Sequence, residues 1–279
     1  MAKRSFNVFL NKKISSFNKI INVDPDKSIS IRSILIGSIS QNISTAKNVL
    51  ESLDVKSAIS SCKKLGVKIN KINHGHYKIY GKGLGSLFIK KNSILNFGNS
   101  GTLARLLIGI LATTPDIKVK LKGDHSLNKR SMKKLIYLMN SFGANFLPKN
   151  KFTFPLKMVS SKFPIGIKYI AGVSAQLKSA VILAGLNSFG KTEIIENEKS
   201  RDHTENILIN NKKVIKIKEK KNKTIEIFGK EQLKPIFIDV PGDPSSAAFF
   251  VSLTLLCKDS KIKIKNVGMN PTRMGFYKI

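Results

Sequence analysis

Two patterns of hydrophobic residues alternate along this chain, one with the spacing of a helix and one with the spacing of a strand. Apolar residues at helical spacing predict helices over residues 28–40, 57–65, 98–112, 126–142, 174–186, 201–210 and 245–256. Alternating apolar and polar residues predict strands over 4–10, 19–23, 67–72, 77–80, 117–122, 192–195, 214–218, 224–228 and 262–267. Residues 46–51 fit a strand or a turn, and the Pro-broken stretch 152–169 is strand-like. This alternation predicts an α/β fold of repeated units, with hairpins at 67–80 and 214–228.

A short phrase, an Asp, any residue and a Ser, marks three of the predicted helix starts. It occurs at Asp26–Ser28, Asp124–Ser126 and Asp243–Ser245. Asp and Ser are preferred N-cap residues, because their side chains accept hydrogen bonds from the first backbone N–H groups. In the first two phrases an arginine, Arg32 or Arg130, follows four residues after the Ser. A helix start with a nearby cation favours a phosphorylated or carboxylated ligand.

Three further helix starts carry polar groups. They are Asn99–Arg105, whose Gly101 permits close approach of a ligand to the backbone, Ser174–Ser179, and Ser200–Glu205. Each of them alone is also compatible with a simple helix cap. Together the helix starts present several cations, which indicates one shared anionic ligand: Lys27, Arg32, Arg105, Arg130 and Arg201.

The length of 279 residues is near the upper limit for one hydrophobic core, so two domains are expected. The net charge of +32 raises the possibility of nucleic-acid binding. However, the lysines are spread along the whole chain, there is no Trp, and no basic stripe is interleaved with aromatics. A genome rich in A and T gives the same composition. We therefore interpret the charge as solvated lysine-rich faces and expect no nucleic-acid partner.

The sequence offers no metal or cofactor motif. The cysteines Cys62 and Cys257 lie in ordinary apolar contexts, which argues against a disulfide framework or a zinc site. The histidines lack metal-ligand spacing, and His203 has no nucleophile motif beside it. The glycines of Gly81–Gly85 alternate and do not form a dinucleotide fingerprint. We expect no metal and no organic cofactor.

Hydrophobic runs and the first residues bear on location. No apolar run reaches the roughly 18 residues of a membrane helix, and the start Met-Ala-Lys-Arg-Ser-Phe-Asn has no apolar signal core. We expect a cytoplasmic protein with no membrane partner.

Taken in order, the motifs of this chain resemble those of 5-enolpyruvylshikimate-3-phosphate synthases. The residues of two motifs, Ser174–Gln176 and Arg201–Glu205, resemble the bacterial class II branch. The resemblance extends along nearly the whole chain through Asp26–Arg32, Gly98–Arg105, Gly123–Arg130, Ser174–Ser179, Ser200–Glu205, Asp239–Phe249 and Asn270–Arg273. It implies 3-phosphoshikimate 1-carboxyvinyltransferase activity. In that reaction the enolpyruvyl group of phosphoenolpyruvate is transferred to the 5-hydroxyl of shikimate 3-phosphate and phosphate is released, in the shikimate pathway to aromatic amino acids, without metal or cofactor.

The resemblance also implies the enolpyruvyl transferase fold, an α/β (α+β) architecture of repeated βαβαββ units. Residues 25–240 would form one complete shikimate-3-phosphate-binding domain of three units. Residues 1–24 would be a fragment of the other domain, and residues 241–279 would return into it. The family implies a monomer whose helix starts face a cleft.

Roles carry over from the family by position. Lys27 would be catalytic and would contact both substrates. Shikimate 3-phosphate would be bound by Lys27, Ser28, Arg32, Ser174, Ala175, Gln176 and Arg201. Phosphoenolpyruvate would be bound by Lys27, Asn99, Gly101, Thr102, Arg130 and Gln176, and Arg105 also matches a family arginine. Glyphosate-sensitive members of the family have Gly at the position of Gly101, so an active form is expected to be sensitive.

The chain departs from the family pattern in length. It covers roughly the first two-thirds of that pattern, and the family's catalytic Asp, Glu and second Lys would lie beyond residue 279. We therefore expect a C-terminally truncated sequence, or half of a split enzyme completed by a second chain, with little turnover by itself. The alternatives are a non-catalytic protein that binds a phosphorylated metabolite and the related UDP-N-acetylglucosamine enolpyruvyl transferase. The reactive Cys loop of the latter has no counterpart here.

Overall fold

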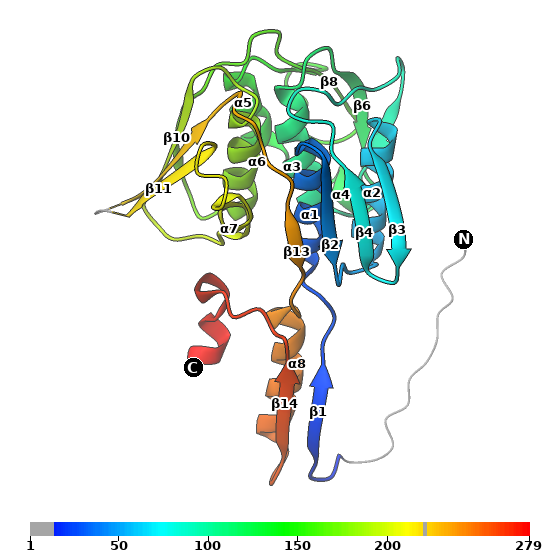
Figure 1. Cartoon of the computed structure of the whole chain (residues 1–279), viewed down its shortest axis with the longest axis vertical. Helices are drawn as coiled ribbons and strands as arrows, with labels where there is room; N and C mark the ends of the chain where they lie inside the picture. The colour runs from blue at the N-terminus through cyan, green and yellow to red at the C-terminus, as the bar shows by residue number, and fades with distance from the viewer. Residues whose placement is uncertain (1–13, 220–221) are drawn as a thin grey trace. The chain divides into compact units, whose positions relative to one another are not determined.

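The computed structural model describes residues 14–219 and 222–279, so the strand predicted over 4–10 lies outside the described residues. The contacts within the chain divide it into two compact units (Figure 1). The larger unit is Pro25–Val240, and the smaller unit combines Met1–Asp24 with Pro241–Ile279.

Three repeats with one topology make up the larger unit. Each repeat has a four-stranded sheet in which a parallel pair is followed by two antiparallel neighbours, in the orders β13-β2-β4-β3, β5-β6-β8-β7 and β9-β10-β12-β11. This confirms the expected α/β fold of repeated βαβαββ units.

The elements of the three repeats follow one another along the chain. The first repeat contains α1 (Lys27–Ile39), β2 (Ile43–Lys47), α2 (Leu53–Lys64), β3 (Lys68–Asn73) and β4 (His76–Tyr80). The second contains β5 (Ile94–Asn96), α3 (Gly101–Ala112), β6 (Lys118–Lys122), α4 (His125–Asn128), α5 (Lys133–Ser141), β7 (Asn145–Leu147) and β8 (Leu156–Val159). The third contains β9 (Lys168–Ala171), α6 (Ala175–Gly185), β10 (Lys191–Glu196), α7 (His203–Leu208), β11 (Ile215–Glu219) and β12 (Lys223–Phe228).

A strand from the far end of the larger unit completes the first repeat. Strand β13 (Phe237–Asp239) pairs in parallel with β2, and its Phe237 lies opposite Thr45. Just before β13 begins, the backbone N–H of Ile236 donates a hydrogen bond to the hydroxyl of Ser44 at 3.0 Å, which stabilises this pairing. The larger unit therefore closes on itself through contacts between residues remote in sequence.

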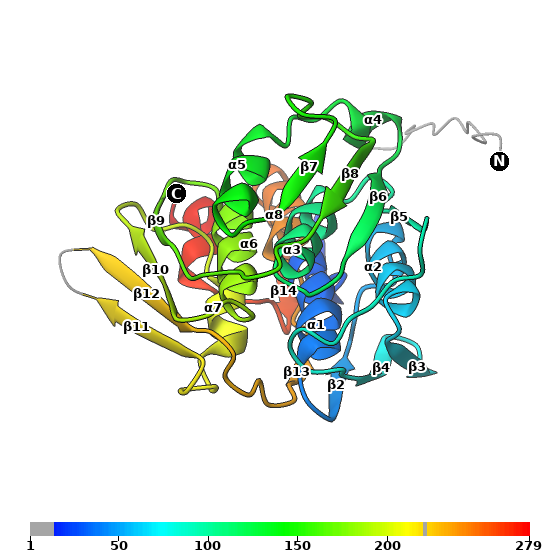
Figure 2. The same ribbon diagram turned by 90° about the horizontal axis from the view of Figure 1, so that it is seen from above.

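The first helix of each repeat is buried in the middle of the larger unit. Figure 2 shows α1, α3 and α6 running next to one another, with the three sheets at the periphery, and α3 packs against both α1 and α6. Most residues of these helices are buried, including polar residues of α1 such as Ser30, Arg32 and Ser33. Gly109 allows the closest approach, because a Cβ there would lie 2.5 Å from the Ala180 carbonyl oxygen of α6.

The three buried helices begin in the same way. Their N-caps are Asp26, Ser100 and Ser174, and each cap side chain accepts a hydrogen bond from the backbone N–H three residues later. Two residues after each cap stands a polar side chain, namely Ser28, Thr102 or Gln176. Three polar side chains thus occupy equivalent positions at the starts of three helices of the same core.

The smaller unit is built on one parallel strand pair. Strand β1 (Asn18–Asn22) pairs with β14 (Lys261–Lys265), and helix α8 (Pro244–Leu256) precedes β14. Two short 3-10 helices follow, Pro271–Arg273 and Gly275–Lys278. Large apolar side chains of α8 are exposed, including Phe249, Leu255 and Leu256. Among the described residues, no helix of either unit combines the length and apolar character needed to cross a membrane.

Three of the sequence predictions need correction. The single helix predicted over 126–142 is broken into α4 and α5, because the backbone N–H of Met132 donates to the Phe152 carbonyl at 2.7 Å instead of continuing the helix. The strand or turn predicted over 46–51 is strand β2, which begins earlier, and the helix predicted over 57–65 starts at Leu53. The short strands β5, β7 and β13 were not predicted, since three residues carry too little periodicity.

Candidate functional site

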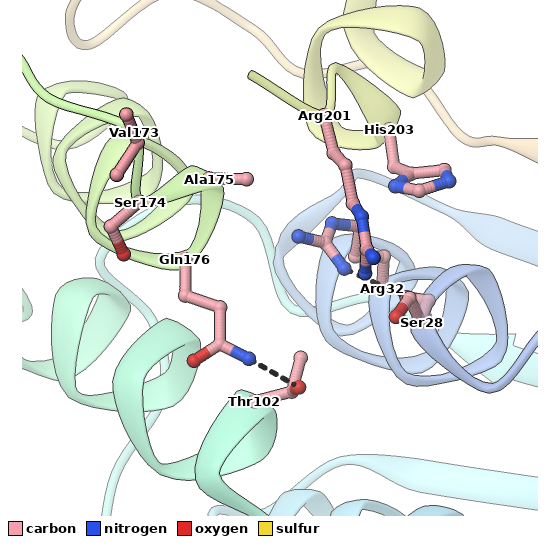
Figure 3. A pocket seen from close by; sticks show the side chains of 9 residues that line it. All are labelled: Ser28, Arg32, Thr102, Val173, Ser174, Ala175, Gln176, Arg201 and His203. Carbon is pink, nitrogen blue, oxygen red and sulfur yellow. Dashed lines mark hydrogen bonds between the residues drawn. The ribbon is translucent and has the colours of Figure 1, made fainter. Parts of the chain in front are cut away.

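A cavity of about 300 Å³ opens at the starts of the three buried helices. Figure 3 shows the side chains that line it, which come from α1, α3, α6 with the residues just before it, the start of α7 and the segment that leads into α7. The lining residues are Ser28, Arg32, Thr102, Val173, Ser174, Ala175, Gln176, Arg201 and His203.

The charge of this cavity is positive. Two arginines, Arg32 and Arg201, line it, and among the described residues no Asp or Glu does. Helix N-termini carry a partial positive charge, so the starts of α1, α3 and α6 add to the positive potential. Backbone N–H groups and guanidinium groups together form a strong site for a phosphate or carboxylate.

The guanidinium of Arg32 is held firmly. The side chain is almost fully buried, with 3% of the residue exposed. Its Nε donates to the Thr204 hydroxyl at 2.8 Å, and its Nη2 donates to the Ser179 hydroxyl at 3.0 Å. Its Nη1 donates to the Ser28 carbonyl at 3.0 Å. The position of this cation is therefore fixed by groups from α1, α6 and α7.

Gln176 links the cavity to a second group of polar residues. Its amide nitrogen donates to the Thr102 hydroxyl at 2.9 Å, as Figure 3 shows, and its amide oxygen accepts from Arg105 Nη1 at 3.0 Å. The same Nη1 donates to the Gly101 carbonyl at 3.1 Å. Burial, and then repulsion by the charge of Arg130, lowers the pKa of Arg105 below its usual value.

The second group is centred on the start of α3. A Cβ on Gly101 would lie 2.8 Å from Arg105 Nη1 and 3.3 Å from Arg130 Nη1, so both arginines lie close to this glycine. Arg130 Nη2 donates to the Asn99 side-chain oxygen at 3.3 Å, and Asn99 donates to Asp124 at 2.8 Å. The break between α4 and α5 positions Arg130, which a continuous helix would have carried elsewhere.

The structure brings together most of the residues predicted from the sequence. The cavity lining contains Ser28, Arg32, Thr102, Ser174, Ala175, Gln176 and Arg201. Asn99, Gly101, Arg105 and Arg130 form the neighbouring group, joined to the cavity through Gln176. Lys27 is not among the lining residues, and its ammonium group pairs with Asp54 at 3.2 Å.

The Asp-x-Ser phrases are helix caps, as predicted. Asp26, Asp124 and Asp243 each accept a backbone hydrogen bond at a helix start. Only the first of them begins a helix that lines this cavity. The equivalent positions of the three repeats are instead capped by Asp26, Ser100 and Ser174, a relation that the phrase itself does not reveal.

Sequence reasoning missed several residues of the site. Val173 and His203 line the cavity, and the hydroxyl groups of Ser179 and Thr204 accept hydrogen bonds from Arg32. His203 and Thr204 belong to the recognised motif Ser200–Glu205, so this motif was the sequence feature that could have pointed to them. Nothing in the sequence marks Val173. In the part of the chain that the structure describes, no group of three or more His, Cys, Asp or Glu residues is arranged to hold a metal ion.

Comparisons with known proteins agree with one another. A family model described as EPSP synthase (3-phosphoshikimate 1-carboxyvinyltransferase) matches residues 11–279. A 3-phosphoshikimate 1-carboxyvinyltransferase of Bacillus velezensis is 41% identical over 95% of this chain and 60% of its own length. One from Ruegeria sp. is 36% identical over 96% of this chain and 59% of its own length.

Solved structures give the same result. An EPSP synthase structure from Acinetobacter baumannii superposes with a TM-score of 0.83 at 34% identity, covering 95% of this chain and 59% of that one. The 279-residue chain thus spans about three-fifths of the length of the relatives that it matches.

Proposed function

Since the chain belongs to the EPSP synthase (3-phosphoshikimate 1-carboxyvinyltransferase) family, we propose that its cavity binds shikimate 3-phosphate for enolpyruvyl transfer. In the proposed reaction the 5-hydroxyl of shikimate 3-phosphate receives the enolpyruvyl group of phosphoenolpyruvate and phosphate leaves.

One observation carries this proposal: three equivalent helix starts and two arginines meet in a single cavity. A phosphate monoester carries close to two negative charges at neutral pH, and helix N-termini and guanidinium groups are its usual partners in proteins. The start of α6 and Arg201 would hold the phosphate. The neutral hydrogen-bonding groups of Ser28 and Gln176 suit the hydroxyls of the ring.

For phosphoenolpyruvate we propose the neighbouring group at the start of α3. Gly101 leaves the helix start open, and Arg105 and Arg130 lie beside it. Gln176 touches both groups, since it bonds Thr102 and Arg105. The two anionic substrates would therefore bind on either side of this one amide, which brings their reacting ends together.

Lys27 is proposed to contact both substrates, although it now pairs with Asp54. Its side chain is 48% exposed, and such exposed ion pairs contribute at most about 1 kcal/mol. Release from Asp54 is therefore easy when a substrate anion arrives. Cations that converge on the reacting groups would also stabilise the charge that develops during addition and elimination.

Calorimetric titration of the 279-residue chain tests the proposal. Shikimate 3-phosphate should bind, whereas shikimate, which lacks the phosphate, should bind at least tenfold more weakly. Arg201→Ala should weaken shikimate 3-phosphate binding by about 10- to 100-fold, since hydrogen bonds to charged groups contribute roughly 1.5–3 kcal/mol. The control Lys149→Ala removes one charge from an exposed site outside the cavity lining and should leave the affinity unchanged. Equal affinity for shikimate and shikimate 3-phosphate would refute the proposal.

A further inference from the structure

A cluster of four charged side chains is buried behind the cavity wall. The ammonium group of Lys178, on α6, lies 2.7 Å from a carboxylate oxygen of Glu196 and 2.7 Å from one of Glu205, on α7. Lys223 lies 3.6 Å from each of the same two carboxylates. The side chains of Lys178, Glu196 and Glu205 have no exposed surface, and that of Lys223 is 9% exposed. None of these residues lines the cavity.

On each of the two helices, a residue adjacent in sequence to a member of the cluster contacts Arg32. Ser179 follows Lys178 on α6, and Thr204 precedes Glu205 on α7. The Thr204 hydroxyl donates to the Ser179 hydroxyl at 2.8 Å, and both hydroxyl oxygens accept from the Arg32 guanidinium. Helices α6 and α7 are therefore joined by an ion pair and, beside it, by a hydrogen bond that supports Arg32.

The same cluster also holds the segment that precedes α7. Both the backbone N–H and the hydroxyl of Ser200 donate to Glu196, at 2.8 and 2.6 Å. Ser200 is adjacent to Arg201, the second cation of the cavity. The buried ionic cluster thus contains the sequence neighbours of the two hydroxyl groups that hold Arg32, and it binds the residue that precedes Arg201.

We propose that this cluster and the Ser179–Thr204 pair form a positioning device that sets Arg32 and Arg201 for the phosphorylated ligand. The inference rests on the proposed function and assigns a role to six residues that lie outside the cavity lining: Lys178, Ser179, Glu196, Thr204, Glu205 and Lys223. They act through Arg32 and Arg201 and are positioning residues.

Stability by itself does not account for such a cluster. Moving charges out of water is costly, and well-packed apolar side chains in place of a buried ion pair are often as stable or more stable. Long arginine side chains otherwise lose rotamer freedom when they bind a ligand, and this ordering weakens the affinity. A guanidinium that is already fixed avoids this loss, because its geometry is set in the absence of ligand.

The sharpest test replaces Thr204 with valine, which keeps the shape of the side chain but removes the hydroxyl that accepts from Arg32 Nε. Shikimate 3-phosphate binding to the 279-residue chain, followed by NMR titration into the millimolar range, should weaken by about 10-fold or more. Thr204→Ser keeps the hydroxyl and should restore the wild-type affinity to within about twofold. Thermal unfolding of each variant reports its stability separately.

A double-mutant cycle separates positioning from a general structural effect. If Thr204 acts through Arg32, Thr204→Val should change the affinity less than about twofold in an Arg32→Ala background, whereas a general loosening of the fold would weaken binding equally in both backgrounds. Equal effects in both backgrounds, or an unchanged affinity in Thr204→Val alone, would overturn the positioning role. Absence of shikimate 3-phosphate binding by the wild-type chain would instead refute the proposed function.

A separate double variant tests the positioning role of the ionic cluster. Lys178→Met combined with Glu205→Gln removes one charge of each sign and leaves Lys223 with Glu196, so no net charge is buried. We expect a folded protein whose affinity for shikimate 3-phosphate falls at least about fivefold. A wild-type affinity in this double variant would show that the cluster has no positioning role.

Discussion

We predict that substitution of Lys178 alone strongly destabilises the larger unit. Its ammonium group contacts Glu196 and Glu205 at 2.7 Å each, with no exposure of any of the three side chains. Among the described residues neither carboxylate oxygen of Glu205 receives a hydrogen bond, so this carboxylate depends on its lysine partners. Lys178→Met would leave two buried carboxylates facing one lysine, Lys223, at 3.6 Å.

The size of the effect follows from the charge that is left behind. Removing one partner of a buried ion pair typically costs about 3–5 kcal/mol, because the remaining charge stays buried without compensation. For a unit of this size each kcal/mol lowers the melting temperature by about 2–4 °C. We therefore expect Lys178→Met to lower the melting temperature of the larger unit by about 6–20 °C at pH 7.

Thermal unfolding followed by circular dichroism measures this shift. The matched control is Lys191→Met, which makes the same substitution in a half-exposed ion pair in which Lys191 lies 3.0 Å from Glu226. That variant should lose less than about 1 kcal/mol. The double variant Lys178→Met with Glu205→Gln should recover most of the lost stability, since it restores neutrality. A Lys178→Met shift no larger than that of the control would refute the reasoning.

Three further predictions follow from other parts of the molecule. Burial raises the pKa of the Cys62 thiol to about 12, so a thiol reagent at pH 8 should modify Cys257 and leave Cys62 unreacted until the protein unfolds; rapid reaction of both cysteines would contradict this. The backbone N–H of Gly75 and the side chain of Lys71 lower the pKa of Glu51 from 4.5 to about 2. The ionised carboxylate therefore contributes its full stability above pH 4.5 and loses it as the pH falls towards 2. A carboxyl NMR titration of Glu51 with a midpoint above about 4 would exclude this. In any active form glyphosate should compete with phosphoenolpyruvate, and Gly101→Ala should weaken that competition, because the new Cβ would lie 2.8 Å from Arg105 Nη1. Steady-state kinetics that show no competition would contradict the assignment of Gly101.

Local signals in the sequence predicted the helices and hairpins well. The cap at Asp26 and the apolar spacing after it predicted α1, and the start of α6 at Ser174 was predicted in the same way. The hairpin of β3 and β4 also follows from local alternation. These elements are determined by residues close together in sequence, which is why the pattern reveals them.

Contacts between distant segments escaped the sequence analysis. The pairing of β13 with β2 and the break before α5 depend on partners far along the chain, such as Phe152 for Met132. Most of the cavity residues lie in segments that the sequence analysis singled out as polar helix starts, whereas the ligand role of each residue came from the resemblance to a family. Lys178 and Glu205 lie in two of the recognised motifs, but their burial was not predicted, because a charged residue normally indicates a solvated position and only the fold shows that these two are buried.

A crystal structure of the 279-residue chain soaked with shikimate 3-phosphate tests the proposed binding site most directly. The ligand is expected in the cavity at the starts of α1, α3 and α6, with its phosphate contacting the start of α6 and Arg201. Ligand density elsewhere on the larger unit, with only solvent in this cavity, would refute the proposed site.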